Sequence, residues 1–281
     1  MKNRFDRRSF LKKAGCTALG ASTLAWDWPA VGELHEEEFS FRSTWPHGLQ
    51  RPWPGPAYWP NPLQDWRVHA GRLECISSGG DRNVALLTRE VSGRSGNLKL
   101  SVRLGSLDGS AQERGFVGFR VGIKYPMQDY RATAIYGRGM NVGIHADGRL
   151  FIGTLEASAP KIDIKHEIRL QFYAHPSAKG YKVLLRAVSV NGGRSVEIDR
   201  EIPAEWLIGG LALACSSAEL EPTPVEFPMI KDFSFYPPNQ HAGGTMKFWF
   251  RDWTISGSKI DVHDERAYGP ILFTLYTVSR G

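Results

Sequence analysis

The chain has 281 residues, of which 42% are apolar and 11% are aromatic. This composition supplies enough apolar side chains for a substantial core and excludes a chain that is disordered throughout. The formal net charge is +6, but residues 1–25 hold six basic residues against one acidic residue and so carry +5 of it. The remainder is close to neutral, so the charge predicts no nucleic-acid partner. No apolar run reaches about 18 residues, so no transmembrane helix is predicted.

Residues 1–30 begin with a basic segment and continue with a short, weakly apolar one. Residues 7–12 read RRSFLK, and residues 14–26 read AGCTALGASTLAW. This arrangement resembles a twin-arginine export signal, which a translocase reads as an address; the alternative is a basic, solvated helix. We expect residues 1–30 to be a signal peptide. The protein would then be periplasmic or extracellular, with no membrane attachment after signal cleavage.

Residues 31–57 are predicted to form an arm rich in Pro and Trp. The stretch at 44–62 reads TWPHGLQRPWPGPAYWPNP, and its repeated X-Pro steps exclude a helix. Two interpretations of its aromatic residues remain open. Either Trp45, Trp53 and Trp59 close one end of the domain, or exposed rings stack on sugars. We retain Trp53, Tyr58 and Trp59 as candidate stacking residues.

From residue 58 onward the chain alternates between apolar and polar residues in short segments separated by turns. Clean alternation occurs in NLKLSVRLGSL at 97–107, HEIRLQFYAH at 166–175 and GYKVLLRAVSV at 180–190. Side chains that alternate in this way point to opposite faces of a strand. Roughly a dozen such strands, with a helical turn expected at 204–208, predict an all-β fold for residues 58–281. The expected architecture is a two-sheet β-sandwich or jelly roll.

The stretch at 115–153 is predicted to form four of these strands. In its first strand, GFVGFRVGIK at 115–124, alternation places four apolar residues on the core face: Val117, Phe119, Val121 and Ile123. The opposite face carries Gly118 and Gly122 beside Arg120 and Lys124. Because glycines leave the sheet bare between two cationic side chains, we predict that this face is the floor of a ligand groove.

Extending the alternation through the following strands adds polar residues to the Arg120 face. The candidate ligand-binding residues on it are Arg120, Lys124, Arg131, Asn141 and His145. An arginine offers a planar fork of donors to carboxylate or phosphate groups. The set therefore suits a glycan or an anionic polymer. The alternative is an ordinary solvated sheet face.

Two cysteines, Cys75 and Cys215, remain once residues 1–30 are set aside. In an exported protein they could form a disulfide, and as small apolar residues they could equally fill the core. The candidate metal ligand is Asp252, which lies between Phe250 and Trp253 and needs a partner there. That partner is either an arginine or a cation such as Ca²⁺. We expect no other cofactor.

The sequence favours binding over catalysis. It lacks the E-x-D-x-x-E carboxylate pattern of sandwich glycosidases and the G-x-S-x-G motif of serine hydrolases. An acid/base pair assembled from separate strands, such as Asp129 with Glu156, remains open. The alternative to a binding module is therefore a glycan-cleaving enzyme, either a hydrolase or a lyase.

Three segments resemble a known module. They are YWPNPLQDWRVHAGRLECISSGGDRNVALLT at 58–88, GFVGFRVGIK followed by DYRATAIYGRGMNVGI and DGRLFIG within 115–153, and FWFRDWTISGSKIDVHDERAYGPILFTLYTVSRG at 248–281. Together they resemble the concanavalin A/laminin-G-like region that precedes alkaline phosphatase D-like metallophosphoesterases. The resemblance implies a concanavalin A-like sandwich with such a metallophosphoesterase as partner. The G-D-x-x-D/Y and G-N-H-D/E motifs of the catalytic half are absent, so the resemblance covers the accessory half alone.

Two further interpretations remain beside this one. The hairpin DWRVHAGRLE at 65–74 is distantly similar to the sandwich of 3-keto-disaccharide hydrolases. A purely structural domain that docks on the metallophosphoesterase is the other interpretation. A docking domain would expose a large apolar patch, which we expect around residues 271–278.

Overall fold

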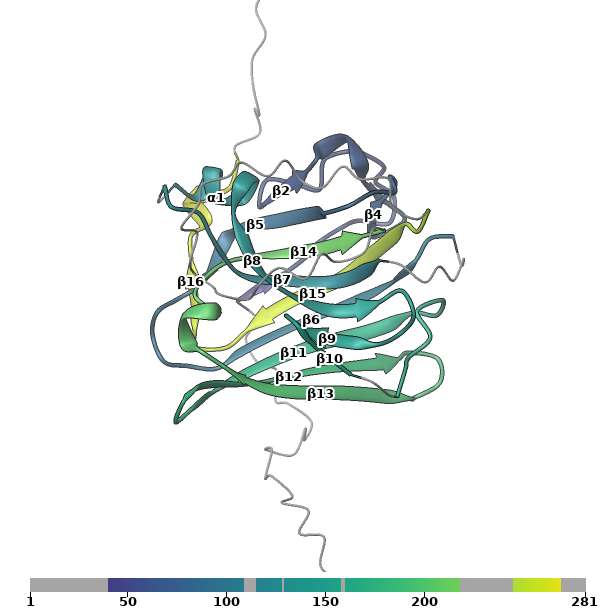
Figure 1. Ribbon diagram of the computed structural model, residues 1–281. Helices are drawn as coiled ribbons and strands as arrows, with labels where there is room; N and C mark the ends of the chain where they lie inside the picture. Colours follow the sequence, from purple (N-terminus) through teal and green to yellow (C-terminus); the bar gives the residue numbers. More distant parts are fainter. Residues whose placement is uncertain (1–39, 109–114, 128, 158–159, 218–244, 269–281) are drawn as a thin grey trace, which may run out of the picture. The chain divides into compact units, whose positions relative to one another are not determined.

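Alternating apolar and polar residues build two antiparallel sheets, sheet A and sheet B (Figure 1). The structure, a computed structural model, describes residues 40–108, 115–127, 129–157, 160–217 and 245–268. All of these belong to one unit, Glu38–Gly281. The predicted signal peptide at 1–30 and the predicted apolar patch at 271–278 lie outside the described residues.

Each sheet contains eight of the described strands. Sheet A follows the order β13 (Ser195–Ile202), β12 (Gly180–Ser189), β11 (Ile168–Ser177), β6 (Leu98–Ser106), β15 (Phe248–Ser256), β4 (Arg72–Cys75) and β3 (Trp66–His69), with β1 (Phe41–Arg42) paired to β15. Sheet B follows the order β10 (Leu155–Glu156), β9 (Leu150–Ile152), β8 (Arg138–His145), β7 (Phe116–Lys124), β14 (Gly209–Ser216), β5 (Arg82–Val91) and β16 (Ile260–Val262), with β2 (Tyr58–Asn61) paired to β5.

The described helical segments are short. They are α1 (Tyr130–Tyr136) and the 3-10 turns η1 (Leu63–Asp65), η2 (Ala204–Trp206) and η3 (Asp264–Arg266). The turn η2 confirms the helical turn expected at 204–208. Within the described ranges, no helix is long and apolar enough to cross a membrane.

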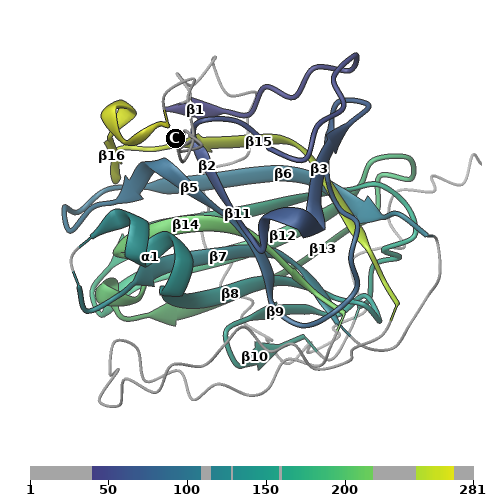
Figure 2. The same cartoon turned by 90° about the horizontal axis from the view of Figure 1, so that it is seen from above.

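The two sheets stack, and their inward-facing residues form the core (Figure 2). Strand β6 shows the predicted alternation, since Leu98, Leu100, Val102 and Leu104 are each at most 1% exposed. Burying one such aliphatic side chain stabilises a fold by about 1.5–3 kcal/mol. The predicted all-β, two-sheet, concanavalin A-like sandwich is confirmed by this arrangement.

The described part of the arm, residues 40–57, packs onto the core. Strand β1 pairs with β15, and Trp45 is only 7% exposed. Tyr58 is 6% exposed, its ring lies 6.0 Å from that of Phe41, and burial raises the pKa of its hydroxyl strongly. The prediction that Tyr58 stacks on a ligand is therefore wrong. The pleat of β2 turns this ring inward and its neighbour Trp59 outward.

Residues 130–136 form helix α1, where the alternation predicts a strand. The Asp129 carboxylate accepts hydrogen bonds from the backbone N–H groups of Arg131 at 2.7 Å and Ala132 at 3.4 Å. Such a cap satisfies backbone donors that a helix N-terminus leaves unpaired. Ala132 and Ala134 then favour the helix, and Ala134 is buried against sheet B. Capping and packing therefore outweigh the alternating pattern here.

Cys75 on β4 and Cys215 on β14 approach each other from the two sheets. Both are 1% exposed and neither is in a disulfide. Burial raises the pKa of the Cys215 thiol, and a hydrogen bond with Cys75 raises it further. In this structure the two cysteines fill the core as free thiols.

Candidate ligand-binding site

The outer face of sheet B carries three of the predicted ligand residues, Arg120, Asn141 and His145. Strand register places Arg120 of β7 opposite Asn141 of β8, and Arg120 Nε donates to Asn141 Oδ1 at 2.8 Å. His145 lies four positions further along β8, which corresponds to about 13 Å at about 3.3 Å per residue. The structure therefore brings Arg120 and Asn141 together, as predicted, and leaves His145 in a separate cluster.

Arg120 is held inside a polar network. The residue is 8% exposed, and its Nη2 donates to Asp81 Oδ1 at 2.5 Å. Asp81 adopts a left-handed backbone conformation with φ of 39°. Because Asp81 and Asn141 already engage all three guanidinium nitrogens of this buried side chain, a ligand contact at Arg120 would require the network to open.

The glycines of β7 do not clear space for a ligand, contrary to the prediction. A Cβ atom at Gly118 would collide with the carbonyl oxygen of Val142 and with Cα of Gly143. Gly122 has φ of 66°, and a Cβ atom there would collide with the carbonyl oxygen of Trp206. Both positions need glycine because backbone atoms approach them closely.

His145 belongs to an ionic cluster at the β8–β9 hairpin. Its Nε2 atom lies 3.2 Å from Glu156 Oε1. Burial lowers the pKa of His145, although the Glu156 charge acts in the opposite direction. Burial by itself would raise the pKa of Asp147, but hydrogen bonds from Lys161 and Arg149 outweigh it and lower that pKa to about 2. The charges of this cluster compensate one another.

A cavity of about 660 Å³ opens between α1 and the outer face of sheet B, and we call it the helix groove. Tyr130 of α1 forms part of its wall, and the Tyr125 ring packs 5.7 Å from that of Tyr136. The lining residues are Ala85, Leu86, Leu87, Arg89, Glu90, Ile123, Lys124, Tyr125, Pro126, Tyr130, Thr133, Ala134, Ile208, Gly209, Gly210, Leu211 and Arg266.

Two glycines at the start of strand β14, Gly209 and Gly210, line the helix groove. Gly209 has φ of 129°, and a Cβ atom there would collide with the carbonyl oxygen of Ile123. The pairing of β14 with both neighbours shifts register between Gly210 and Leu211. Such an irregularity bends a strand and redirects its side chains. The β14 backbone is therefore irregular at the point where it lines the groove.

The charged residues of the helix groove have partners within the protein. Arg266 Nη1 donates to Glu90 Oε2 at 2.9 Å. Lys124, a predicted ligand residue, does line this groove, and its Nζ donates to the carbonyl oxygen of Glu205 at 2.5 Å. Burial lowers the pKa of Lys124, while the Glu205 charge acts to raise it. The groove thus offers both donors and acceptors at its rim.

Two arginines lie beside the ring of Tyr130 in the groove. The guanidinium carbons of Arg131 and Arg266 lie 5.7 and 5.2 Å from its ring centroid. Arg131 was expected on the strand face beside Arg120, and that placement is wrong because the residue lies on α1. Its side chain is exposed and pairs with Asp129 at 3.1 Å.

Trp59, another predicted stacking residue, lies on the outer face of sheet B outside the groove lining. Its Nε1 atom donates to Asn61 Oδ1 at 2.9 Å, and its ring is 5.5 Å from that of Tyr268. It packs against the apolar cluster that also contains Ala134 of α1. Trp59 therefore supports the helix that forms the groove wall.

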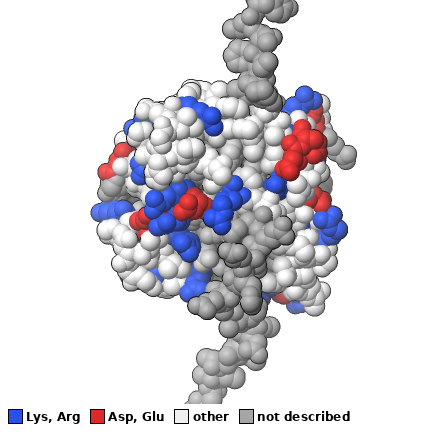
Figure 3. Space-filling model, turned by 180° about the vertical axis from the view of Figure 1, so that it is seen from behind, with Lys and Arg blue, Asp and Glu red and all other residues white. Residues whose placement is uncertain are grey.

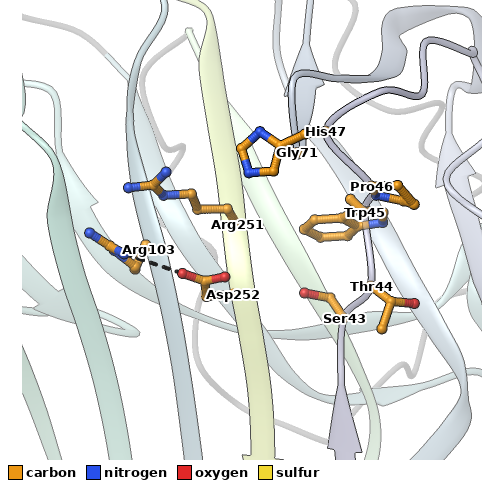
Figure 4. A pocket seen from close by; sticks show the side chains of 9 residues that line it. All are labelled: Ser43, Thr44, Trp45, Pro46, His47, Gly71, Arg103, Arg251 and Asp252. Atoms are coloured by element: carbon orange, nitrogen blue, oxygen red, sulfur yellow. Dashed lines mark hydrogen bonds and ion pairs between the residues drawn. The ribbon is translucent and has the colours of Figure 1, made fainter.

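A second cavity, of about 500 Å³, lies on the outer face of sheet A, and we call it the arginine pocket (Figure 4). The predicted metal residue Asp252 lines it, and its Oδ2 atom is 3.4 Å from Arg103 Nη1. The structure thus places an arginine beside this carboxylate. In the part of the chain that the structure describes, no group of three or more His, Cys, Asp or Glu residues could hold a metal ion. Calcium at Asp252 stays a prediction.

No family model and no curated protein matches the chain. Among solved structures it is similar to a basic winged bean lectin with Tn-antigen, with 11% identity and a TM-score of 0.48 over 78% of this chain and 97% of that one. It is also similar to metal-free lectin I-B4 from Griffonia simplicifolia, with 8% identity and a TM-score of 0.47 over 78% and 100%. Peanut lectin with a nine-residue peptide gives 10% identity and a TM-score of 0.47 over 79% and 97%. At these scores no argument about function follows from the likeness.

The residues that build the helix groove come from segments that the sequence does not connect. Glu90 and Arg266 are 176 positions apart and meet only in the folded chain. Tyr125 and Tyr130 belong to the stretch at 115–153, which the sequence predicts to form strands. An aspartate followed by Ala-Thr-Ala at 129–134 was the available signal for a capped helix at this point.

Proposed function

We propose that this protein is a carbohydrate-binding module whose ligand lies in the helix groove. The observation that carries the proposal is a cavity of about 660 Å³ that combines tyrosine rings with polar groups at its rim. Cavities of about 300–1,000 Å³ with apolar walls and a few convergent polar groups are typical small-ligand sites.

The features of the groove match those of a sugar ring. A tyrosine presents an apolar face and a polar tip, so Tyr130 and Tyr125 can pack on the C–H face of a pyranose. Sugar hydroxyl groups need acceptors and donors together. The Glu90 carboxylate can accept such hydrogen bonds, and Arg266 and Lys124 can donate them.

The groove suits a neutral glycan better than a strongly acidic polymer. Arg266 is engaged by Glu90, and Lys124 by a backbone carbonyl group. An acidic polymer would meet the Glu90 charge and would have to compete with these existing partners. A neutral glycan can add hydrogen bonds to the same groups without separating them.

We also propose export by the twin-arginine route, a periplasmic or extracellular location, and association with an alkaline phosphatase D-like metallophosphoesterase. The support is in the sequence: the RRSFLK segment at 7–12 and the resemblance of residues 58–88 and 248–281. In that setting the module would hold a glycan polymer near the phosphoesterase.

The test is a glycan array with the full chain, followed by calorimetric titration of the best ligand with Tyr130→Ala. We expect the variant to bind at least about tenfold more weakly, equivalent to about 1.4 kcal/mol. The matched control is Trp53→Ala, because Trp53 does not line the helix groove. Like Tyr130, it is a partly buried ring with a guanidinium carbon, that of Arg51, 5.2 Å from its centroid. This control should leave affinity within about twofold.

A third variant separates the helix groove from the site predicted by sequence. Arg120→Ala removes the centre of the buried network and should leave affinity within about twofold while lowering stability. Loss of binding in folded Arg120→Ala, together with normal binding by Tyr130→Ala, would move the ligand site to the Arg120 face. A silent array would remove the carbohydrate proposal.

A further inference from the structure

The outer face of sheet A carries a row of arginines across three strands. Register places Arg251 of β15 opposite Arg103 of β6, and Arg103 opposite Arg169 of β11. Figure 3, the view from behind, shows Lys and Arg side chains gathered around an acidic group on this side of the molecule. Like charges directly opposite each other on neighbouring strands are destabilising. The row therefore needs anions beside it.

Two carboxylates of the protein compensate the row in part. Glu167 Oε1 and Oε2 accept from Arg251 Nη2 at 2.7 and 2.6 Å, and Glu167 also pairs with Arg103. The second carboxylate, Asp252, lies 3.4 Å from Arg103. Charge-assisted hydrogen bonds are normally about 2.7–2.9 Å long. Arg103 shares the Glu167 carboxylate with Arg251 and makes only a long contact with Asp252. Its guanidinium can therefore bind a further anion.

The arginine pocket places hydrogen-bond donors opposite the arginines (Figure 4). The segment at 43–47 forms the facing wall and contributes the hydroxyl groups of Ser43 and Thr44. Ser43 Oγ accepts from the backbone N–H of Trp253 at 2.9 Å, which leaves its own hydrogen to donate. Hydroxyl and guanidinium groups together make a pocket suited to an oxyanion.

Asp252 reaches the pocket because of an irregularity in β15. The pairing of β15 with β6 shifts register between Arg251 and Thr254, and Asp252 has φ of 53°. Bulges of this kind redirect a side chain. Its side chain is 59% exposed, and the carboxylate points toward Arg103 in Figure 4. The Asp252 carboxylate thus occupies the position that an external anion would take.

We propose that the arginine pocket binds an oxyanion and that Asp252 is its internal competitor. The ligand is the carboxylate, sulfate or phosphate group of a small molecule or of an acidic sugar. When the ligand binds, its oxygens replace the Asp252 carboxylate as the partner of the Arg103 guanidinium. The Asp252 carboxylate then turns to solvent. This site lies on the opposite sheet from the helix groove and does not depend on the function proposed for that groove.

The test is titration of the full chain with sodium sulfate and with glucuronate at constant ionic strength, followed by calorimetry. Glucose serves as the uncharged comparison and should not bind at this pocket. Asp252→Asn removes the competing charge but keeps the size of the side chain, and Asn tolerates the left-handed conformation. We expect this variant to bind sulfate or glucuronate at least about threefold more tightly. Binding of both probes indicates a general oxyanion site, and binding of glucuronate alone indicates an acidic sugar.

Two further variants control the experiment. Arg103→Gln should abolish binding, whereas Arg186→Gln, on β12 of the same sheet, should not change it because Arg186 pairs with Glu197 at 4.0 Å outside the pocket. If Arg103→Gln does not fold, Asp252→Asn still decides. Unchanged or weaker binding by folded Asp252→Asn overturns the proposal. So does an absence of saturation by either probe up to about 50 mM, or calcium binding that Asp252→Asn removes.

Discussion

The two outer faces of the sandwich arise from the same alternating pattern but form different surfaces. On sheet B the outward positions include small residues such as Ala85 and Ala212, and helix α1 packs over them. On sheet A they include Arg103 and Arg251, which share the Glu167 carboxylate at the surface. Alternation therefore predicts which residues of a strand face the core and which face outward. The size and charge of the outer residues decide whether another element covers that face or solvent does.

The largest effect on stability is expected from adding a side chain where strands β7 and β8 of sheet B approach each other closely. Gly118→Ala places a methyl group against the Val142 carbonyl oxygen and Gly143 Cα, so strands β7 and β8 must separate. We expect the free energy of unfolding to fall by at least about 3 kcal/mol. Denaturant titration measures this change. Gly93→Ala, where a Cβ atom would have no neighbour within 4 Å, is the control and should be nearly neutral.

A smaller effect is expected from removing the shared carboxylate on the sheet A side. Glu167→Ala leaves Arg103 and Arg251 opposite each other without their common partner. Because the three side chains are 18–28% exposed, we expect a loss of about 1–2 kcal/mol rather than the full cost of a buried pair. The loss should shrink at high salt. The control is Glu197→Ala, because the Glu197 side chain is 60% exposed. If Glu167→Ala lowers the free energy of unfolding no more than Glu197→Ala does, Glu167 does not compensate the charges of Arg103 and Arg251.

The smallest expected effect concerns pH on the sheet B side. Burial lowers the pKa of His145, whose ring lies against Phe151 and faces Glu156, Asp147 and Arg149. A lowered pKa means that the folded state binds the proton less well than the unfolded state. The stabilisation that neutral, buried His145 contributes is therefore complete above about pH 6.5, the ordinary pKa of histidine. It is lost as the pH falls through the lower pKa that His145 has in the folded state.

Thermal stability should fall less steeply between about pH 7 and pH 5 in His145→Gln than in the wild type. The change in stability should be smaller than that caused by Gly118→Ala or Glu167→Ala. Melting temperatures across this range measure the difference. His166→Gln provides the control, since the His166 side chain is 65% exposed. Equal slopes for wild type and His145→Gln would show that His145 does not contribute to the acid sensitivity.

The sequence determined the sandwich and its core without help from tertiary contacts. Alternation has a local cause, the two-residue period of a strand, so the inward residues of β6 and of the first half of β7 could be read directly. The same rule placed Arg120 opposite Asn141, because both lie in regular strands with matching register. The alternation could not predict that Arg120 is buried, because its partner Asp81 comes from a different part of the chain.

Only the tertiary structure decided where a ligand can enter. Residues 130–136 alternate like a strand, yet the Asp129 cap and the small residues of sheet B allow a helix to pack there. That helix creates the groove together with Glu90 and Arg266, which are distant in sequence. Alternation likewise could not choose between Tyr58 and Trp59 as the outward ring. The choice depends on which sheet face the strand presents to the core, and that is a property of the whole fold.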